Sequence, residues 1–325
     1  MDAGQHLGGM LLALWIALGA AVPAQAHGGS PLMQMMDRTG ADPLPVLLSS
    51  DCGTEIDDQW AVLYLAISPE VRMLGYVGNH ARNGLTAAKA RDTILDALEN
   101  RLGSRDHPPV LAGADGPLPS PEEPRGTEGA RCLVEQSRAF TPTDRLNVLV
   151  IGSHTDVASA ILLDPSIVTR IRVVMMGFRD WPAGGDDWNV QNDPEAARIV
   201  FRSGVPLVVG CGAVALRHLS FTTEEAQALL RDTGPAGAWL AECFAAWPER
   251  LGEGGRRVWP IWDVVTVAHL LGYTRAMPYH RPLIGPDLAF DHSAPQGQLS
   301  WIEWVDEGRV WPDFAAKLRA RAGGA

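Results

Sequence analysis

Cysteine and positive charge are both scarce in this chain. Its 325 residues include 4 cysteines, with no Cys-x-x-Cys pair, and we interpret Cys52, Cys132, Cys211 and Cys243 as mostly buried free thiols. Lysine and arginine number 27 against 38 acidic residues, which gives a net charge of −11, and no Lys/Arg-rich run occurs. Nucleic-acid backbones need clustered positive charge, so a nucleic-acid partner is not expected.

Long apolar runs are also missing. The apolar stretch at residues 10–22 is short for a membrane-spanning helix, and Ala24-Gln25-Ala26 behind it has the small-x-small pattern of a cleavage site. We therefore predict a signal peptide at 1–26, a linker at 27–44, one domain at 45–320, and export to the periplasm or outside the cell. The first residues contain Asp2 and no Lys or Arg, which leaves a retained membrane anchor as the alternative.

Apolar segments alternate with segments of helical periodicity along the predicted domain. Strands are expected near 46–48, 71–77, 109–113, 146–151, 171–176 and 205–209, with helices at 57–67, 86–102, 157–163, 235–250 and 261–271. Residues 299–305 alternate like an exposed or edge strand. This order predicts an α/β fold with a doubly wound, mostly parallel central sheet flanked by helices.

An acidic run follows the first predicted strand. Asp51, Glu55, Asp57 and Asp58 fall within eight residues at the strand's carboxyl end, where open α/β sheets bind ligands. One interpretation is a site for a hard divalent cation, which relieves the repulsion between carboxylates. The other is an acidic first turn of a helix, which is common without any ion.

Other polar corners follow other predicted strands. Asn79, Thr155 and the loop at 187–189 each come after a buried strand on the same side of the sheet. In a doubly wound sheet such corners converge on one crevice.

At these corners the chain resembles the inosine–uridine-preferring nucleoside hydrolases. The matching pieces occur in the family's order: Asp51-x-Gly53 with Asp57-Asp58, Gly78-Asn79, Pro109-Val110, Gly113-Ala114, Thr155-Asp156-Val157-Ala158, Met176-Gly177, Trp188-Asn189, Asp193-Pro194-Glu195, and Trp262-Asp263. The resemblance implies calcium-dependent hydrolysis of the N-glycosidic bond of ribonucleosides, and a homo-oligomer. The implied metal ligands are Asp51, Asp58, the main-chain carbonyl of Thr155, and Asp263.

The resemblance also implies roles for individual side chains. Asp51 would be the general base that activates a water. The sugar would be bound by Asp57, Asn79, Met176, Asp187 and Asn189, and the base by Trp188 and Trp262. Each has a plainer interpretation: Asp263 and Thr155 as helix caps, Asn79 as a turn residue, Met176 as core and Asp187 as a solvated charge. Because Asp57 and Asp58 are about 100° apart on a helix, we expect them not to face one atom.

Three departures from the family pattern qualify these expectations. Ser49 stands where the family begins with a further Asp, and Glu55 belongs to an inserted loop with no assigned role. Trp262 replaces the His of pyrimidine-accepting members, so that Trp262, Trp188 and Trp181 are candidates to stack on a purine. His80 is expected to be solvated. The alternatives are a nucleoside-binding protein or pseudoenzyme, and a hydrolase of another N-riboside.

Overall fold

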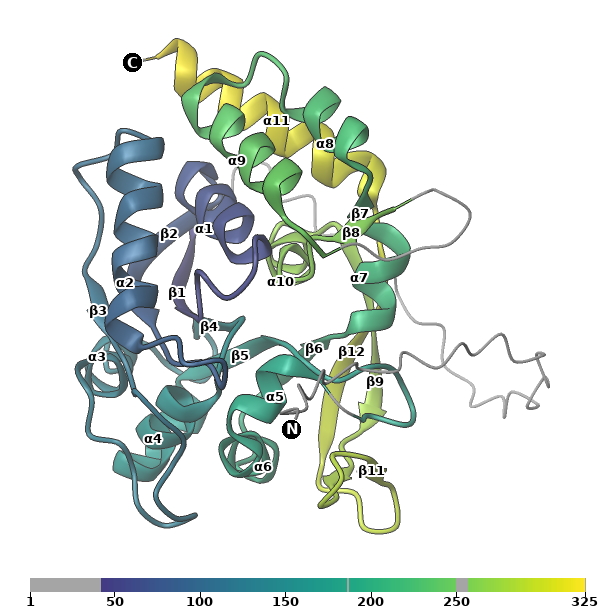
Figure 1. The fold of residues 1–325 in the computed structure, drawn as a ribbon. Coiled ribbons are helices and arrows are strands. Elements are labelled where there is room, and N and C mark those ends of the chain that lie inside the picture. The colour runs from purple at the N-terminus through teal and green to yellow at the C-terminus, as the bar shows by residue number, and fades with distance from the viewer. Residues whose placement is uncertain (1–41, 186, 250–256, 325) are drawn as a thin grey trace, which may run out of the picture. The chain divides into compact units, whose positions relative to one another are not determined.

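The computed structural model describes residues 42–185, 187–249 and 257–324 (Figure 1). The predicted signal peptide at 1–26, and the predicted linker up to residue 41, lie outside the described residues. Among the residues that are described, no helix combines the length and apolar character needed to cross a bilayer.

A central eight-stranded sheet organises the described residues. Its strand order is β3-β2-β1-β4-β5-β6-β12-β9, and every neighbouring pair is parallel except β12 and β9. The sheet strands are β1 Leu44–Ser50, β2 Val71–Gly78, β3 Val110–Ala112, β4 Leu146–Val150, β5 Ile171–Met176, β6 Leu207–Gly210, β9 Thr274–His280 and β12 Gln298–Val305. Two small antiparallel pairs lie outside it, β7 Ser220–Phe221 with β8 Trp259–Pro260, and β10 Leu283–Ile284 with β11 Phe290–Asp291.

Helices cover both faces of the sheet, which confirms the doubly wound α/β prediction. Helices α3, α4 and α6 pack side by side, while α1 packs with α10 and α11 on the other side (Figure 1). The helices are α1 Asp57–Ile67, α2 Ala87–Leu95, α3 Glu128–Ser137, α4 Thr155–Leu163, α5 Trp188–Asn192, α6 Pro194–Arg202, α7 Gly212–His218, α8 Thr223–Leu230, α9 Gly234–Ala246, α10 Val264–Leu270 and α11 Glu307–Gly323, with a 3₁₀ turn η2 at Pro165–Thr169.

The strand order reverses between β1 and β4. From β1 the chain winds outward through β2 to β3, then returns to β4 and winds the other way. All five residues of β4 are buried, as expected for a parallel strand covered on both faces. The two strands that meet at the reversal end beside each other, and open α/β sheets bind ligands at such a place.

Two predicted elements differ in the structure. Residues 299–305 are not at an edge, because β12 lies between β6 and β9. The edge strand β9 was not predicted, since its half-buried sequence contains Pro278 and lacks a continuous apolar run. The predicted helix at 86–102 is regular only to Leu95 and continues as a π-helical turn, η1, at Asp96–Arg101.

Buried Arg281 ties the edge strand to the rest of the sheet. Its guanidinium donates to the main-chain oxygens of Phe201 at 3.1 Å, Val205 at 2.6 Å and Gln298 at 2.8 Å. These charge-assisted hydrogen bonds join the end of β9 to β12 and to the segment between α6 and β6.

Side-chain caps mark the starts of two helices. Asp193 caps α6 by accepting from the Ala196 amide at 3.0 Å, with Pro194 in the first turn. Thr222 and Glu225 form a reciprocal capping box at the start of α8. The cysteines are free as predicted, with Cys52 and Cys211 buried and Cys132 and Cys243 half-buried.

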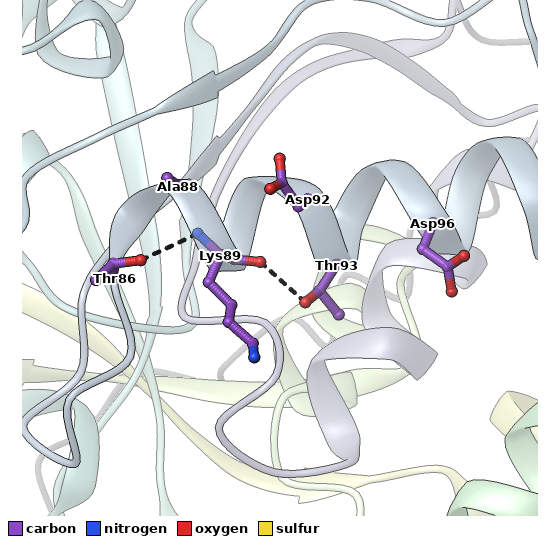
Figure 2. A pocket seen from close by; sticks show the side chains of 6 residues that line it. All are labelled: Thr86, Ala88, Lys89, Asp92, Thr93 and Asp96. Carbon is purple, nitrogen blue, oxygen red and sulfur yellow. Dashed lines mark hydrogen bonds between the residues drawn. The ribbon is translucent and has the colours of Figure 1, made fainter.

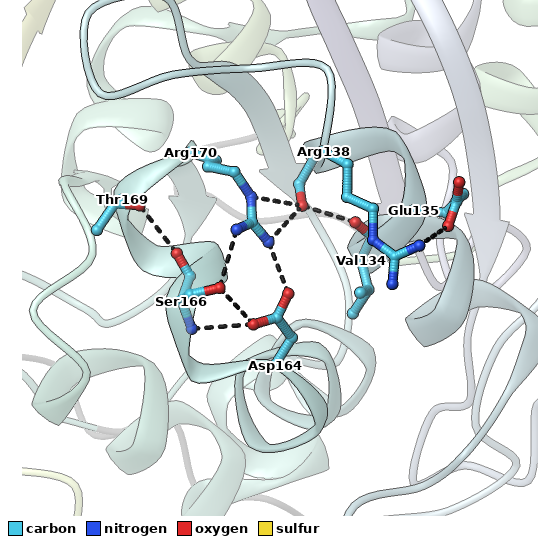
Figure 3. A network of polar contacts seen from close by, with 8 residues as sticks. Val134, Glu135, Arg138, Asp164, Ser166, Thr169 and Arg170 are labelled. Carbon is cyan, nitrogen blue, oxygen red and sulfur yellow. Dashed lines mark hydrogen bonds and ion pairs between the residues drawn. The ribbon is translucent and has the colours of Figure 1, made fainter.

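A polar network joins α3 to the η2 turn below β5 (Figure 3). Arg170 pairs with Asp164 at 2.7 Å and donates to Ser166 at 2.9 Å and to Ser137 at 3.2 Å. Surface ion pairs contribute little free energy, about 0–1 kcal/mol each, so this network orients the chain rather than stabilising the fold strongly.

Gly78 ends β2 where the backbone of α2 crosses it. A Cβ atom there would lie 2.3 Å from the Arg91 amide nitrogen and 2.9 Å from the Ala87 oxygen. Because backbone atoms of a helix cannot yield as a side chain does, we expect Gly78→Ala to lower the free energy of unfolding by about 3 kcal/mol. Gly308→Ala in the first turn of α11, where Cβ has room, should change it by less than about 1 kcal/mol. Equal effects in denaturant unfolding would contradict this account.

Candidate active site

The acidic loop connects β1 to α1 at the strand reversal. Asp51 follows the last residue of β1, and the chain then turns through Gly53, whose φ of 105° favours glycine. The Thr54 amide donates to the Asp51 carbonyl at 3.1 Å and closes the turn. Helix α1 begins at Asp57, so Asp57 and Asp58 occupy its first turn.

Three carboxylates gather at the start of α1 and α10. Oxygens of Asp57, Asp58 and Asp263 lie within 4.8 Å of one another, and all three residues are buried. Asp57 and Asp58 are about 100° apart around the helix, yet the reach of their side chains brings both carboxylates to Asp263; whether they face the same atom stays a prediction. Asp51 lies outside this group of three.

Asp263 does not serve as a helix cap. It precedes α10, yet its side chain makes no capping hydrogen bond. Its carboxylate joins the group of three instead, which favours the functional interpretation over the plain one. Ser50, which sequence reasoning did not single out, donates its hydroxyl to Asp58 Oδ1 at 2.5 Å and fixes that carboxylate.

The donor set suits a hard cation. Burial raises the pKa of Asp57 to about 6 and raises the pKa values of Asp58 and Asp263 well above their usual range, because neighbouring acids add repulsion to desolvation for the last two. Within the described residues no lysine or arginine forms an ion pair with these acids. Closely spaced buried oxygens without a protein cation match the ligands of Ca²⁺, Mg²⁺ or Mn²⁺.

Asp51 is held by three donors on one oxygen. Its Oδ2 accepts from Trp188 Nε1 at 3.1 Å, Thr54 Oγ1 at 3.2 Å and Asn192 Nδ2 at 3.3 Å. Burial raises the pKa of Asp51 to about 7; the hydrogen bond from Trp188 opposes the rise and the charge of Asp57 adds to it. A carboxyl of this pKa can accept or release a proton near neutral pH.

Asn79 braces the strand reversal. It is fully buried, its Nδ2 donates to Ser49 Oγ at 2.7 Å and to the Ser153 oxygen at 3.3 Å, and its Oδ1 accepts from the Ser153 amide at 3.3 Å. Both ends of the amide are thus used within the protein, and the sugar contact expected of Asn79 stays a prediction. The acceptor Ser49 is the residue that stands where the resemblance implies an acid.

Gly152 allows the ends of β1 and β4 to meet. A Cβ there would lie 2.4 Å from the Asp51 amide nitrogen and 2.5 Å from Asn79 Oδ1. Just after it, Thr155 begins α4 and donates its hydroxyl to Asp193 Oδ2 at 2.7 Å. With its side chain engaged there, Thr155 can offer a cation only its main-chain carbonyl.

The predicted sugar-binding residues surround α5. Met176 ends β5, is buried, and its carbonyl accepts from Asn189 Nδ2 at 3.3 Å. Asp187 is not simply a solvated charge, because it caps α5 by accepting from the Asn189 amide at 3.0 Å. These contacts bring the end of β5 and the start of α5 together.

The three candidate tryptophans lie in different surroundings. Trp188 lies against Asp51, and half-buried Trp262 meets Trp259 edge-on at 6.1 Å between ring centroids. Half-buried Trp181 stacks its ring on Tyr279 at 4.5 Å and also packs on Trp301, so part of its surface is used by the aromatic residues of β9 and β12.

His80 is less solvated than expected, and Glu55, which had no assigned role, is half-buried. Burial, with the charges of Asp57 and Asp51, raises the pKa of Glu55 to about 9. His80 is buried, and its two ring nitrogens face the main-chain oxygens of Ala114 at 3.1 Å and Asn192 at 3.3 Å. Neither residue carried a sequence signal beyond its type.

A separate surface pocket lies on α2 (Figure 2). It is lined by Thr86, Ala88, Lys89, Asp92, Thr93 and Asp96. None of the predicted site residues lines it.

The fold and these contacts indicate the class of the protein. It is an α/β protein whose buried acids, at the strand reversal, suit a cation and a polar small molecule. Residues 46–295 match the family described as inosine-uridine preferring nucleoside hydrolase, and the chain belongs to that family. It is therefore an N-glycosidase of the nucleoside hydrolase type.

Individual proteins resemble the chain more distantly. The pyrimidine-specific ribonucleoside hydrolase RihB of Escherichia coli (strain SE11) is 25% identical over 213 residues, which are 59% of this chain and 67% of that protein. A plant nucleoside hydrolase, PpNRh1, shares the fold with a TM-score of 0.69 at 17% identity, covering 86% of this chain and 99% of that one. The purine-preferring ribonucleoside hydrolase from Gardnerella vaginalis gives 0.68 at 20% identity, covering 86% and 100%.

Asp58→Asn tests whether the three acids hold a cation. Asn keeps an acceptor for Ser50 but removes one negative charge, so in EDTA the variant should melt at or above the wild-type temperature. A cation that binds only the folded state at 100 times its Kd adds about 2.7 kcal/mol, a rise of a few degrees, to the wild type and much less to the variant. The exposed Asp92→Asn is the control in these thermal melts. Cation-induced shifts of the same size in Asp58→Asn and wild type would refute the site.

Proposed function

We propose that the protein hydrolyses the N-glycosidic bond of ribonucleosides, with Ca²⁺ as the cation and Asp51 as the general base. The observation that carries this proposal is the buried Asp51 carboxylate, with one oxygen fixed by three donors. Its position beside the three acids at the strand reversal supports the assignment.

Asp51, Asp58, Asp263 and the Thr155 carbonyl would hold the ion, and Asp57 is a further candidate from the group of three. When bound, Ca²⁺ would position a water and lower its pKa. Asp51 would take the proton of that water. The buried negative charges would stabilise a sugar that develops oxocarbenium character as the bond to the base breaks.

Residues around α5 would hold the sugar. Asn189 keeps one amide N–H and its carbonyl beyond the bond to Met176, and would use them toward ribose hydroxyls. Met176 would pack beneath the sugar. Asp187 would reach the 5′ group from its capping position, and Asp57 the 2′-hydroxyl from the edge of the acid group.

The aromatic pair Trp259 and Trp262 supports a purine preference. Trp262 offers a flat apolar ring where a His would protonate the leaving base, and stacking favours the larger purine ring. The relatives named above include one pyrimidine-specific and one purine-preferring enzyme, so family membership alone leaves the base open.

A nucleoside-binding protein without turnover is the second candidate. Ser49 favours this second candidate. Its hydroxyl replaces a family acid behind the proposed metal site, and that hydroxyl already accepts a hydrogen bond from Asn79. A hydrolase of another N-riboside is a variant of the first candidate.

A substrate panel with an Asp51 variant separates these functions. We expect the protein with Ca²⁺ to release base from inosine, adenosine or guanosine faster than from uridine, and to stop when EDTA removes the ion. Asp51→Asn, which still accepts hydrogen bonds, should lower kcat by at least about 10²-fold, the low end of base catalysis. Asp92→Asn is the matched surface control. Ligand binding without base release from any riboside would favour the binding protein, and near-wild-type rates in folded Asp51→Asn would remove its role.

We also propose export with cleavage before His27, on the basis of the apolar stretch at 10–22 and the Ala24-Gln25-Ala26 pattern. Mass spectrometry of the protein recovered from a bacterial cell envelope or medium should find His27 as the first residue. Recovery of a chain that begins at Met1 in the membrane fraction would point to a retained anchor. A homo-oligomer and the absence of a stable membrane anchor belong to the same proposal.

A further inference from the structure

We propose that Trp188 and Asn192 on α5 are positioning residues that fix the Asp51 carboxylate for catalysis, a role that rests on the proposed function of Asp51. The two residues are one helical turn apart, so their side chains lie on the same face of α5. Trp188 Nε1 and Asn192 Nδ2 donate to the same oxygen, Asp51 Oδ2, at 3.1 and 3.3 Å.

The orientation of the Asn192 amide is determined by a second contact. Its Oδ1 accepts from the Arg82 amide at 3.0 Å, which can bind only the oxygen end. The nitrogen end must therefore face Asp51. The amide thus links the loop after β2 to the carboxylate after β1.

The same loop supports α5 at two further points. His80 Nε2 faces the Asn192 main-chain oxygen at 3.3 Å, and the Arg82 guanidinium lies 4.6 Å from the centre of the Trp188 ring. Both donors to Asp51 are thus held from behind, so that their own rotamers are restricted. Sites built this way keep reacting groups within a few tenths of an ångström.

The two oxygens of the Asp51 carboxylate have different surroundings. With Thr54 at 3.2 Å, Oδ2 accepts three hydrogen bonds, while Oδ1 accepts no side-chain donor among the described residues. The three donors saturate Oδ2, which has two lone pairs, and prevent the carboxylate from rotating. Oδ1 is then the oxygen left both for the ion and for the proton of the attacking water. Trp188 thus contacts the general base, Asp51, rather than the nucleobase of the substrate.

Asn192→Asp replaces the donor by an acceptor and adds one negative charge. Aspartate keeps the shape and the oxygen that accepts from Arg82, but places an acceptor against Asp51 Oδ2. Loss of one hydrogen bond to a charged group corresponds to about tenfold, and repulsion between acids adds to it, so we expect kcat to fall at least about tenfold with KM within about threefold. Asn83→Asp in the same loop adds the same charge at an exposed side chain and should leave kcat unchanged.

Trp188→Phe keeps a ring beside Arg82 and removes the N–H. We expect kcat to fall about tenfold with KM little changed. Because both donors share one oxygen, the double variant with Asn192→Asp should lose more than the product of the single losses. A purely structural role would lower the melting temperature in parallel with kcat, whereas Trp188→Phe should lower kcat alone.

The indole N–H resonance of Trp188 decides the contact independently of turnover. In ¹H–¹⁵N spectra the resonance missing from Trp188→Phe identifies it, and Asp51→Ala should shift it and speed its exchange with water. The positioning role would be overturned if the enzyme were active and neither α5 variant changed its kcat. It would also be overturned if Asp51→Ala left the indole resonance unchanged. A wild type that cleaves no riboside, but whose indole resonance responds to Asp51→Ala, would overturn the proposed function and with it the role in rate, while the contact itself would stand.

Discussion

Mutual repulsion among buried carboxylates is the constraint on which this structure depends. Asp57, Asp58 and Asp263 come within 4.8 Å of one another in the interior, and Asp51 lies close enough to raise the pKa values of Asp58 and Asp263. Burying like charges is unfavourable unless a cation, a proton or hydrogen bonds compensate. The protein supplies hydrogen bonds from Ser50 to Asp58 and from α5 to Asp51, and a bound ion could compensate the remaining charge.

Close approach of backbones makes this arrangement possible. At the strand reversal, Gly152 lets the ends of β1 and β4 touch, and Gly78 lets α2 cross the end of β2. Gly113 has the same role next to Asp156, whose carboxylate would collide with a Cβ at 2.2 Å. The sequence pieces that resemble the nucleoside hydrolases are thus partly packing devices. They position the site without any contact to a ligand.

Polar side chains then fix loops that the sheet itself does not hold. Asp193 caps α6 while accepting from the Leu118 amide at 2.8 Å and the Thr155 hydroxyl at 2.7 Å, so that three segments depend on one carboxylate. Asn79 does the same between β1 and β4. Because each buried donor or acceptor that loses its partner costs about 1–3 kcal/mol, such junctions have one stable arrangement.

The sequence by itself determined the order of strands and helices, the acidic run after β1, and the polar corners after β2, β4 and β5. These signals are local, since periodicity, caps and glycines act within a few residues. Only the tertiary structure decided that Asp57 joins Asp263 and that Asn192 donates to Asp51. It also decided that Asn79 and His80 are buried and hydrogen-bonded within the protein. The same holds for the packing of Trp181 on Tyr279 and for the interior position of β12. Each of these depends on side chains far apart in the chain, as Asp57 and Asp263 are. The direction in which a side chain points across a packed interface follows from how helices sit on the sheet, which no local pattern specifies.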